Sequence, residues 1–426
     1  MKSKGEIRFA VIGCGRRAPA YPRTIKAVKG AKLVALCDKV GPLVKGIKKL
    51  ADDDSIREYT DHRKMLKEGG FDAVIVVTEP EYQASLSVEA MEAGYDVYSD
   101  VPVTFSLEDC WKLVVTVERT KKVYYLGEQM RHTLLMRYWR ELVRGGALGT
   151  VLFAEGHYIH AMACDRFWRN SETGELLTWE QAQKTDRRVK TRMWSMRHPV
   201  LYGPHELSPL LKVLDDRVAS VSCYSTGLPN KRWKEIPFPC QFEECPRPDM
   251  EVALMFTEKG TILRFGANFS SPVSQSHWYH LLGTKGEIET RRGSAETGYS
   301  YFYPTPVMHD GVYHFARTPE PWFYSGGRPS DDLAYALESE MPEALRSTSA
   351  SRATGHGGMD FYPVADFVNC LLTGDKPYMD VYEAVDTAAP CILAVKSAES
   401  GGDRFTVPDF RPNKKRKPGE MPEHML

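Results

Sequence analysis

The stretch GCGRRA, residues 13–18, constrains the fold of this chain more than any other part of the sequence. It follows a short apolar run, IRFAVI, and precedes an amphipathic segment, so it places a glycine-rich turn between a strand and a helix. Gly13, Gly15 and Ala18 occupy the G-x-G-x-x-G/A positions, which permit a tight turn, close approach of a pyrophosphate and close helix–strand packing. The turn therefore predicts a dinucleotide-binding βαβ unit.

The segments after this turn continue the alternation of strand and helix patterns. The apolar runs KLVALCD, FDAVIVV and DVYSD are separated by helical patterns, which predicts a doubly wound parallel sheet of the Rossmann type. Cys14, Arg16 and Arg17 belong to the turn where a cofactor phosphate would meet the helix N-terminus. We also expect Thr78 and Asp100 to contact the cofactor, because ligands of an open α/β sheet bind outside the carboxyl ends of its strands.

Asp38 suggests which dinucleotide binds. It ends the strand that follows Ala18, where an acid accepts hydrogen bonds from the adenosine ribose hydroxyls and repels the 2′-phosphate of NADP. Lys39 weakens this argument, because its charge partly offsets that of the acid. The sequence predicts NAD as the cofactor. The alternative is that the glycines belong to an ordinary loop and that Asp38 is a solvated acid.

Charge and cysteine content restrict the partners. Lysine plus arginine equals aspartate plus glutamate at 56 each, so no overall charge favours nucleic acid or an anionic membrane. We interpret the basic run NKKRK, residues 413–417, as a solvated tail. Nine cysteines without CxxC pairs indicate a reducing, cytoplasmic compartment. Cys240 and Cys245 lack the further ligands of a zinc site, so no metal is expected. No apolar stretch approaches membrane-spanning length.

Longer stretches of the sequence resemble known enzymes. VVTEP, the acid-x-Pro after GYDVYS, and ALGTVLFAEGHY resemble the Gfo/Idh/MocA superfamily of sugar-acting oxidoreductases. Within it, the chain is similar to the NAD-dependent glycosidases of the α-N-acetylgalactosaminidase type, through SLEDCWKLVVTVERTKKVYYLGEQMRH, EGHYIH, WSMRHPVLYGPHELSP and GHGGMDFYPVADFVNCLLTGDKPYMDVYEAVDTAAP. The resemblance implies an N-terminal Rossmann domain and a C-terminal α/β domain built on an open, mostly antiparallel sheet.

Two positions depart from the plain dehydrogenases of that superfamily. Those enzymes usually carry Glu-Lys-Pro where this chain has Asp100-Val101-Pro102. They also carry an Asp four residues before a His, where this chain has Leu201 before His205. Both missing groups handle protons, and the glycosidases that the chain resembles lack the lysine as well.

The resemblance to these glycosidases implies that Glu128, Tyr158, Tyr202 and His205 line the sugar site and carry catalysis. His205 would lie in the first turn of a helix, where the N-terminus favours a neutral ring that accepts a proton. Taken alone, these two residue types are more often structural: Tyr158 a half-buried strand aromatic and His205 a histidine with satisfied hydrogen bonds. Relatives usually have a small residue after this histidine, whereas this chain has Glu206.

Three further residues are candidates for substrate binding. Trp194 and Arg197 lie in a long polar insertion, residues 161–200, that could cover a sugar or could be a solvated loop with buried aromatics. His356 lies in TGHGGMD, which could bind an anion or form a turn with Asp360 capping the following helix.

These observations predict a Rossmann domain over residues 1–150, a substrate-binding and oligomerisation domain over 151–410 and a polar tail over 411–426. Alternating strands between about 249 and 290 offer a sheet face through which the chain would form a homo-oligomer, a dimer or a tetramer. The expected partner is a small-molecule carbohydrate, with no nucleic acid and no membrane.

The function that these features predict is glycoside hydrolysis by transient C3 oxidation, elimination, hydration and re-reduction, with bound NAD recycled. The first alternative is an NAD-dependent sugar dehydrogenase that releases NADH and uses His205 as its base. The second is an inactive NAD-binding sensor or scaffold. The sugar, its anomer and its aglycone do not follow from the sequence, although basic side chains in the insertion permit an anionic sugar.

Overall fold

The computed structural model describes residues 5–160, 168–190, 197–226, 248–269, 277–290, 339 and 341–423, together with the backbone of four short strands between residues 300 and 320. In that part of the chain, no helix has the length and apolar character needed to cross a bilayer.

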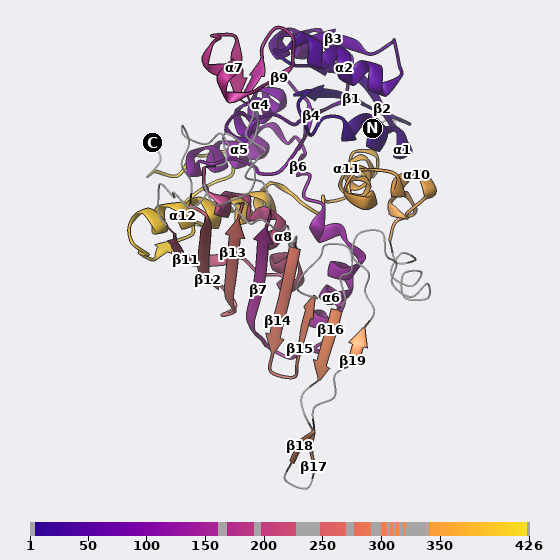
Figure 1. The fold of residues 1–426 in the computed structure, drawn as a ribbon. Helices are drawn as coiled ribbons and strands as arrows, with labels where there is room; N and C mark the ends of the chain where they lie inside the picture. The colour runs from indigo at the N-terminus through magenta and orange to yellow at the C-terminus, as the bar shows by residue number, and fades with distance from the viewer. Residues whose placement is uncertain are drawn as a thin grey trace.

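The N-terminal part is a parallel six-stranded sheet in the order β3-β2-β1-β4-β5-β6 (Figure 1). Its strands are β1 (Ile7–Ile12), β2 (Ala31–Cys37), β3 (Arg57–Tyr59), β4 (Ala73–Val76), β5 (Asp96–Ser99) and β6 (Tyr124–Leu126). The connecting helices are α1 (Ala20–Ala27), α2 (Gly41–Ala51), α3 (His62–Glu68), α4 (Pro80–Glu92) and α5 (Leu107–Thr120). The strand order reverses between β1 and β4, which is where a Rossmann sheet opens its ligand crevice.

The second part is built on a nine-stranded open sheet in the order β19-β16-β15-β14-β7-β13-β12-β11-β20. The strands are β7 (Val151–Ile159), β11 (Val218–Ser225), β12 (Met250–Thr257), β13 (Ile262–Asn268), β14 (His277–Gly283), β15 (Gly286–Thr290), β16 (Ser300–Pro304), β19 (Thr318–Glu320) and β20 (Phe405–Thr406). Only the β13–β7 pair is parallel among the pairs of this sheet. The predicted fold class is therefore confirmed.

Helices separate the two sheets and cover one face of the larger one (Figure 1). They are α8 (Pro204–Leu214) and α12 (Val381–Glu399), with α6 (Leu134–Arg144) and the short 3₁₀ helices η1 (Met130–His132) and η3 (Pro199–Tyr202) beside them. The remaining elements are β8 (Trp168–Asn170), β9 (Leu176–Leu177), α7 (Trp179–Gln183), β10 (Arg188–Lys190), β17 (Val307–His309), β18 (Val312–His314), η5 (Glu343–Leu345), α10 (Ser349–Arg352), η6 (His356–Gly358) and α11 (Phe361–Thr373).

Helix α11 lies far along the sequence but packs against the N-terminal sheet. Its buried Phe367 contacts Phe9 of β1 at a ring-centroid distance of 6.1 Å, Tyr98 of β5 at 5.9 Å and Tyr125 of β6 at 5.7 Å. Tyr98 and Tyr125 also stack on each other with an interplanar angle of 5°. Because these rings bury apolar area from both halves of the chain, the two sheets share one hydrophobic core.

The C-terminal segment is anchored by a buried ion pair. The Arg416 guanidinium donates to both carboxylate oxygens of Glu118 on α5 at 2.7 Å, and the two side chains are 5 % and 4 % exposed. Glu118 also accepts hydrogen bonds from the Tyr382 hydroxyl and the Gly419 amide. The expectation that NKKRK is a solvated tail is therefore wrong for Arg416, whose charge finds a buried partner on the nucleotide domain.

We expect the Arg416→Ala variant to lose about 3–5 kcal/mol of unfolding free energy, because the substitution leaves the Glu118 carboxylate buried without its partner. Chemical denaturation followed by circular dichroism measures this loss. The Lys415→Ala variant removes a neighbouring exposed charge and is the matched control, with an unchanged denaturation midpoint. Equal midpoints for the two variants would show that the ion pair does not anchor the segment.

Candidate functional site

The predicted cofactor turn has the geometry that a dinucleotide requires. Gly13 has φ of +102°, and a side chain there would collide with the Val77 carbonyl. No atom of the described chain lies within 4 Å of the position that a Cβ would take at Gly15, so a phosphate can approach its backbone. Ala18 is fully buried where α1 approaches the sheet. These features fit a bound dinucleotide.

Asp38 lies directly after β2, beside the same turn. Its carboxylate accepts hydrogen bonds from the Cys14 amide at 2.7 Å and the Val40 amide at 2.8 Å. Thr78 follows β4, and its methyl carbon is 3.0 Å from the position of a Cβ at Gly13. The structure thus brings Gly13, Cys14, Asp38 and Thr78 together at the carboxyl end of the sheet.

Arg17, one of the two arginines expected beside a cofactor phosphate, also has protein partners. Its guanidinium donates to both oxygens of Asp360 at 2.7 and 2.8 Å, and its Nε is 3.4 Å from Asp100. Arg16, in contrast, is exposed. Asp360 also pairs with His356 Nδ1 at 2.8 Å. This aspartate stands at the start of α11 but accepts no helix-capping hydrogen bond, so the interpretation of Asp360 as a cap is wrong.

The pairing of Asp360 has a clear electrostatic cause. Burial opposes its ionisation, but the hydrogen bond from His356 and the charge of Arg17 together hold the pKa of Asp360 well below its ordinary value. The ionised carboxylate therefore binds the turn that carries Arg17 to the 356–360 segment.

A carboxylate–histidine pair joins the two halves of the molecule. Glu128 follows β6 at the end of the Rossmann domain, and His205 lies in the first turn of α8. Their Oε1 and Nδ1 atoms are 3.0 Å apart, and the two residues are 0 % and 6 % exposed. Because Glu128 accepts at Nδ1, it favours the tautomer that carries its proton there and has its lone pair on Nε2.

The surroundings of Glu128 determine how strongly it holds a proton. Burial raises the pKa of Glu128 to about 7, against the opposing effects of hydrogen bonds from the Met130 and Arg131 amides and of the Arg131 charge. The two amides are 2.8 and 3.1 Å from the carboxylate oxygens. The Glu128–His205 pair can therefore take up or release a proton near neutral pH.

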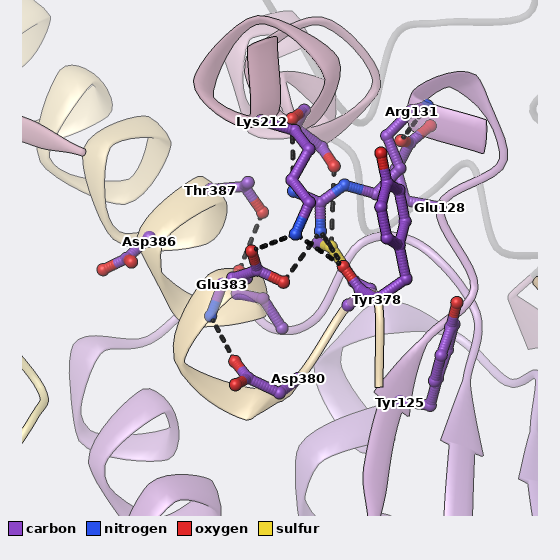
Figure 2. A network of polar contacts seen from close by, with 12 residues as sticks. Tyr125, Glu128, Arg131, Lys212, Tyr378, Asp380, Glu383, Asp386 and Thr387 are labelled. Atoms are coloured by element: carbon purple, nitrogen blue, oxygen red, sulfur yellow. Dashed lines mark hydrogen bonds and ion pairs between the residues drawn. The ribbon is translucent and has the colours of Figure 1, made fainter. Parts of the chain in front are cut away.

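A second polar network fixes the backbone behind this pair. Figure 2 shows the Arg131 and Lys212 side chains pointing toward Glu383, in the first turn of α12. Arg131 Nη1 is 3.2 Å and Lys212 Nζ is 2.7 Å from the Glu383 carboxylate, and both also donate to the Tyr378 carbonyl. Because Arg131 lies in η1 and Lys212 in α8, the network holds the segments that carry Glu128 and His205 in register.

Aromatic rings surround His205. Tyr158 of β7 lies nearly parallel to the His205 ring, with centroids 5.6 Å apart and an interplanar angle of 10°. The Tyr202 ring is 4.9 Å from His205 and 5.1 Å from Tyr158. His160 lies 4.1 Å from Tyr158. The four predicted catalytic residues, Glu128, Tyr158, Tyr202 and His205, are thus brought together.

Three residues of this cluster were not among the predicted catalytic residues: His160, Glu206 and His277 of β14. His277 lies opposite Tyr158 in the sheet register, with ring centroids 5.3 Å apart. It also contacts Glu206, which follows His205. The His160–Tyr158 spacing was visible in EGHYIH, but the pairing of β7 with β14 was not available from the sequence.

Of the three predicted substrate-binding residues, His356 is found near the ring cluster. Trp194 lies outside the described residues, and Arg197 is exposed just before η3. His356 is 46 % exposed and lies near the ring cluster, where its charge contributes to lowering the pKa values of His160 and His277. Burial is the main cause of both shifts.

The described part of the insertion, β8 to β10 with α7, lies beside the Rossmann domain (Figure 1). Trp168 is buried against Ala182 and Leu177 of the insertion itself. A Cβ at Gly174 would contact Pro42 and Leu43, at the start of α2, at 3.4 Å. This part of the insertion contains a small core of its own, and its Gly174 turn lies close to the start of α2.

Comparisons with known proteins identify related domains. Residues 7–128 match the model of the Gfo/Idh/MocA oxidoreductase family, NAD-binding Rossmann fold, and residues 334–416 match that of the glycosyl hydrolase 109 C-terminal domain. A glycosyl hydrolase family 109 protein of Solibacter usitatus is 27 % identical over 96 % of this chain and 89 % of its own length. A family 109 protein of Bacteroides thetaiotaomicron is 24 % identical over 95 % of this chain and 84 % of its own.

A solved oxidoreductase from Agrobacterium radiobacter, in complex with NAD⁺, L-tartaric acid and magnesium, shares the fold with a TM-score of 0.65 and 17 % identity, over 94 % of this chain and 98 % of that one. The chain thus combines an NAD-binding Rossmann domain of the Gfo/Idh/MocA oxidoreductase family with a glycosyl hydrolase 109 C-terminal domain, and it is similar over nearly its whole length to proteins named glycosyl hydrolase family 109.

Proposed function

We propose that this glycosidase cleaves its substrate by transient oxidation. Oxidation of the C3 hydroxyl to a ketone acidifies the C2 proton, loss of that proton expels the C1 substituent, water adds at C1, and hydride returns to C3. Bound NAD supplies this hydride chemistry. The net reaction is hydrolysis, and it needs proton acceptors for the C3 hydroxyl and C2 rather than the paired carboxylates of ordinary glycosidases.

The single observation that carries the proposal is the buried Glu128–His205 pair, at 3.0 Å, beside Tyr158 and Tyr202. The tautomer that Glu128 favours places the basic lone pair on His205 Nε2. We assign the C2 proton to His205, with Glu128 stabilising the imidazolium that forms. Tyr158 and Tyr202 would position hydroxyls or relay the C3 hydroxyl proton.

The residues that replace the usual dehydrogenase proton handlers support the same proposal. Val101 is 1 % exposed and Leu201 is 8 % exposed. Neither side chain can accept a proton, so the titratable groups around His205 carry the proton steps.

We predict that turnover in deuterated water places deuterium at C2 of the released sugar while added NAD is not consumed. The His205→Ala variant should retain NAD but lose about 10²- to 10⁴-fold in rate, the usual contribution of a general base. The His62→Ala variant, on α3, is the matched control, and its activity should equal that of the wild type.

Mass spectrometry of the released sugar measures the deuterium at C2. Absorbance of reduced nicotinamide measures whether NADH accumulates. If C2 stays protiated while NADH accumulates in step with substrate loss, the chain is a dehydrogenase, which is the alternative reaction for this site.

We propose NAD rather than NADP as the cofactor, because the Asp38 carboxylate at the end of β2 would repel a 2′-phosphate. Isothermal titration calorimetry should show tighter binding of NAD than of NADP to the wild type, and the Asp38→Ala variant should narrow this difference. Equal affinities of the wild type for the two dinucleotides would contradict the assignment.

We also propose that a second copy of the chain covers the sheet face opposite α8 and α12. Five large apolar side chains, each at least 39 % exposed, follow neighbouring strands on that face: Tyr224, Leu254, Phe256, Ile262 and Leu282. Such a patch on an open sheet favours self-association. Light scattering should give a dimer or tetramer at micromolar concentration, and a Leu254→Lys/Phe256→Lys variant should be monomeric. A monomeric wild type would refute this assembly.

A further inference from the structure

A second buried acid–histidine pair lies next to the first. Glu206 follows His205 in α8 and is 0 % exposed. Its Oε1 is 2.5 Å from Nδ1 of His277, the first residue of β14. The His277 ring is 5.8 Å from His205, 5.3 Å from Tyr158 and 5.7 Å from His160, measured between ring centroids. Both pairs therefore meet the same cluster of rings.

The backbone of β7 makes room for this acid. Gly156 faces α8, and a Cβ there would lie 3.0 Å from the Glu206 Cβ and 3.2 Å from a Leu210 methyl carbon. Both distances are tighter than ordinary van der Waals contact, so a larger residue at 156 would displace Glu206 or α8. The glycine in β7 and the acid in α8 are thus sterically matched.

The two pairs differ in how they hold protons. Burial raises the pKa of Glu206 well above its ordinary value; a hydrogen bond from Tyr279 opposes the rise and the nearby Glu128 adds to it. Burial also lowers the pKa of His277 to about 4. Both shifts favour the uncharged form of the pair, with its shared proton on Glu206, whereas the pKa of Glu128 is about 7. Carboxyl groups whose environments separate their proton affinities in this way divide acid and base roles.

We propose that Glu206 and His277 form the general acid of the reaction, which protonates the departing glycosidic oxygen while the Glu128–His205 pair takes the C2 proton. This inference rests on the proposed elimination mechanism and assigns its second proton-handling group. The electron pair of the broken C2–H bond forms the C1–C2 double bond, and the electron pair of the C1–O bond leaves with the aglycone.

The proton balance of this step closes within the pair. His277 gives its Nε2 proton to the glycosidic oxygen, and the Glu206 proton moves to Nδ1, which leaves Glu206 ionised beside a neutral imidazole. When water adds to C1, its proton passes to His277 Nε2 and the Nδ1 proton returns to Glu206. The proton held by His205 returns to C2. Both pairs end the cycle as they began it, and no further reactant is needed.

The Glu206→Gln variant tests this role, because the amide keeps the size and can still donate to His277 Nδ1 but cannot release a proton. The probes are the methyl and para-nitrophenyl glycosides of one sugar, beginning with N-acetyl-α-galactosaminide. A methoxide needs protonation in order to leave, whereas nitrophenolate does not. We expect the variant to lose about 10²- to 10⁴-fold on the methyl glycoside and at most about tenfold on the nitrophenyl glycoside.

In deuterated water, the variant should also exchange the C2 proton of uncleaved methyl glycoside, because its base remains intact while departure is blocked. The His277→Asn variant should give the same pattern. Retained bound NAD and an unchanged melting temperature show that each variant is folded. The Glu287→Gln variant is the matched control, since Glu287 pairs with His280 at 2.8 Å elsewhere in the sheet, and it should cleave both substrates at the wild-type rate.

Equal losses on both glycosides without C2 exchange would overturn the proposal and make Glu206 a structural residue. Failure of the proposed function itself would be seen in the wild-type enzyme and not in the variants. The wild-type enzyme would then cleave glycosides without placing deuterium at C2, or would accumulate NADH.

Discussion

The hydrogen bond between Glu128 and His205 is the interaction on which the arrangement of this molecule depends. It joins a carboxylate at the end of the Rossmann sheet to a ring at the start of α8, which lies on the second sheet, and both groups are almost completely buried. Burying a carboxylate is energetically costly unless it is paired. Glu128 of the Rossmann domain therefore depends on His205 of the second part of the chain for its partner. The backbone amides of Met130 and Arg131 donate further hydrogen bonds to the Glu128 carboxylate.

Other buried ion pairs keep this junction in place. Arg131 and Lys212 meet at Glu383 behind the site (Figure 2). Arg17, in the cofactor turn, pairs with Asp360. Each pair joins residues that are distant in sequence. The common consequence is that ion pairs link the segments that carry the candidate site residues. The proposed reaction depends on such positioning, because a shift of about 1 Å in a reacting group can cost about 10²-fold in rate.

The sequence predicted those features that local patterns encode. Alternating strand and helix periods gave the Rossmann sheet, and resemblance gave the open second sheet and brought Glu128, Tyr158, Tyr202 and His205 into one set. The sequence analysis could not predict contacts between residues that are distant in sequence and meet only in the folded chain. Arg17 was expected, with Arg16, beside a cofactor phosphate, and its additional pairing with Asp360, 343 positions away, could not be seen in the sequence. Arg416 belonged to a basic run that resembled a solvated tail. The Glu206–His277 pair depended on the register of β14 against β7.

The central claim is that hydride leaves and returns to C3 during each turnover. A glycoside deuterated at C3 tests it most directly, with its rate compared against the unlabelled substrate and its product analysed by mass spectrometry. The account predicts slower cleavage of the deuterated substrate, because the C3–deuterium bond is broken, together with retention of the label at C3 of the released sugar. Equal rates with the label retained would show that C3 takes no part in cleavage and would contradict the account.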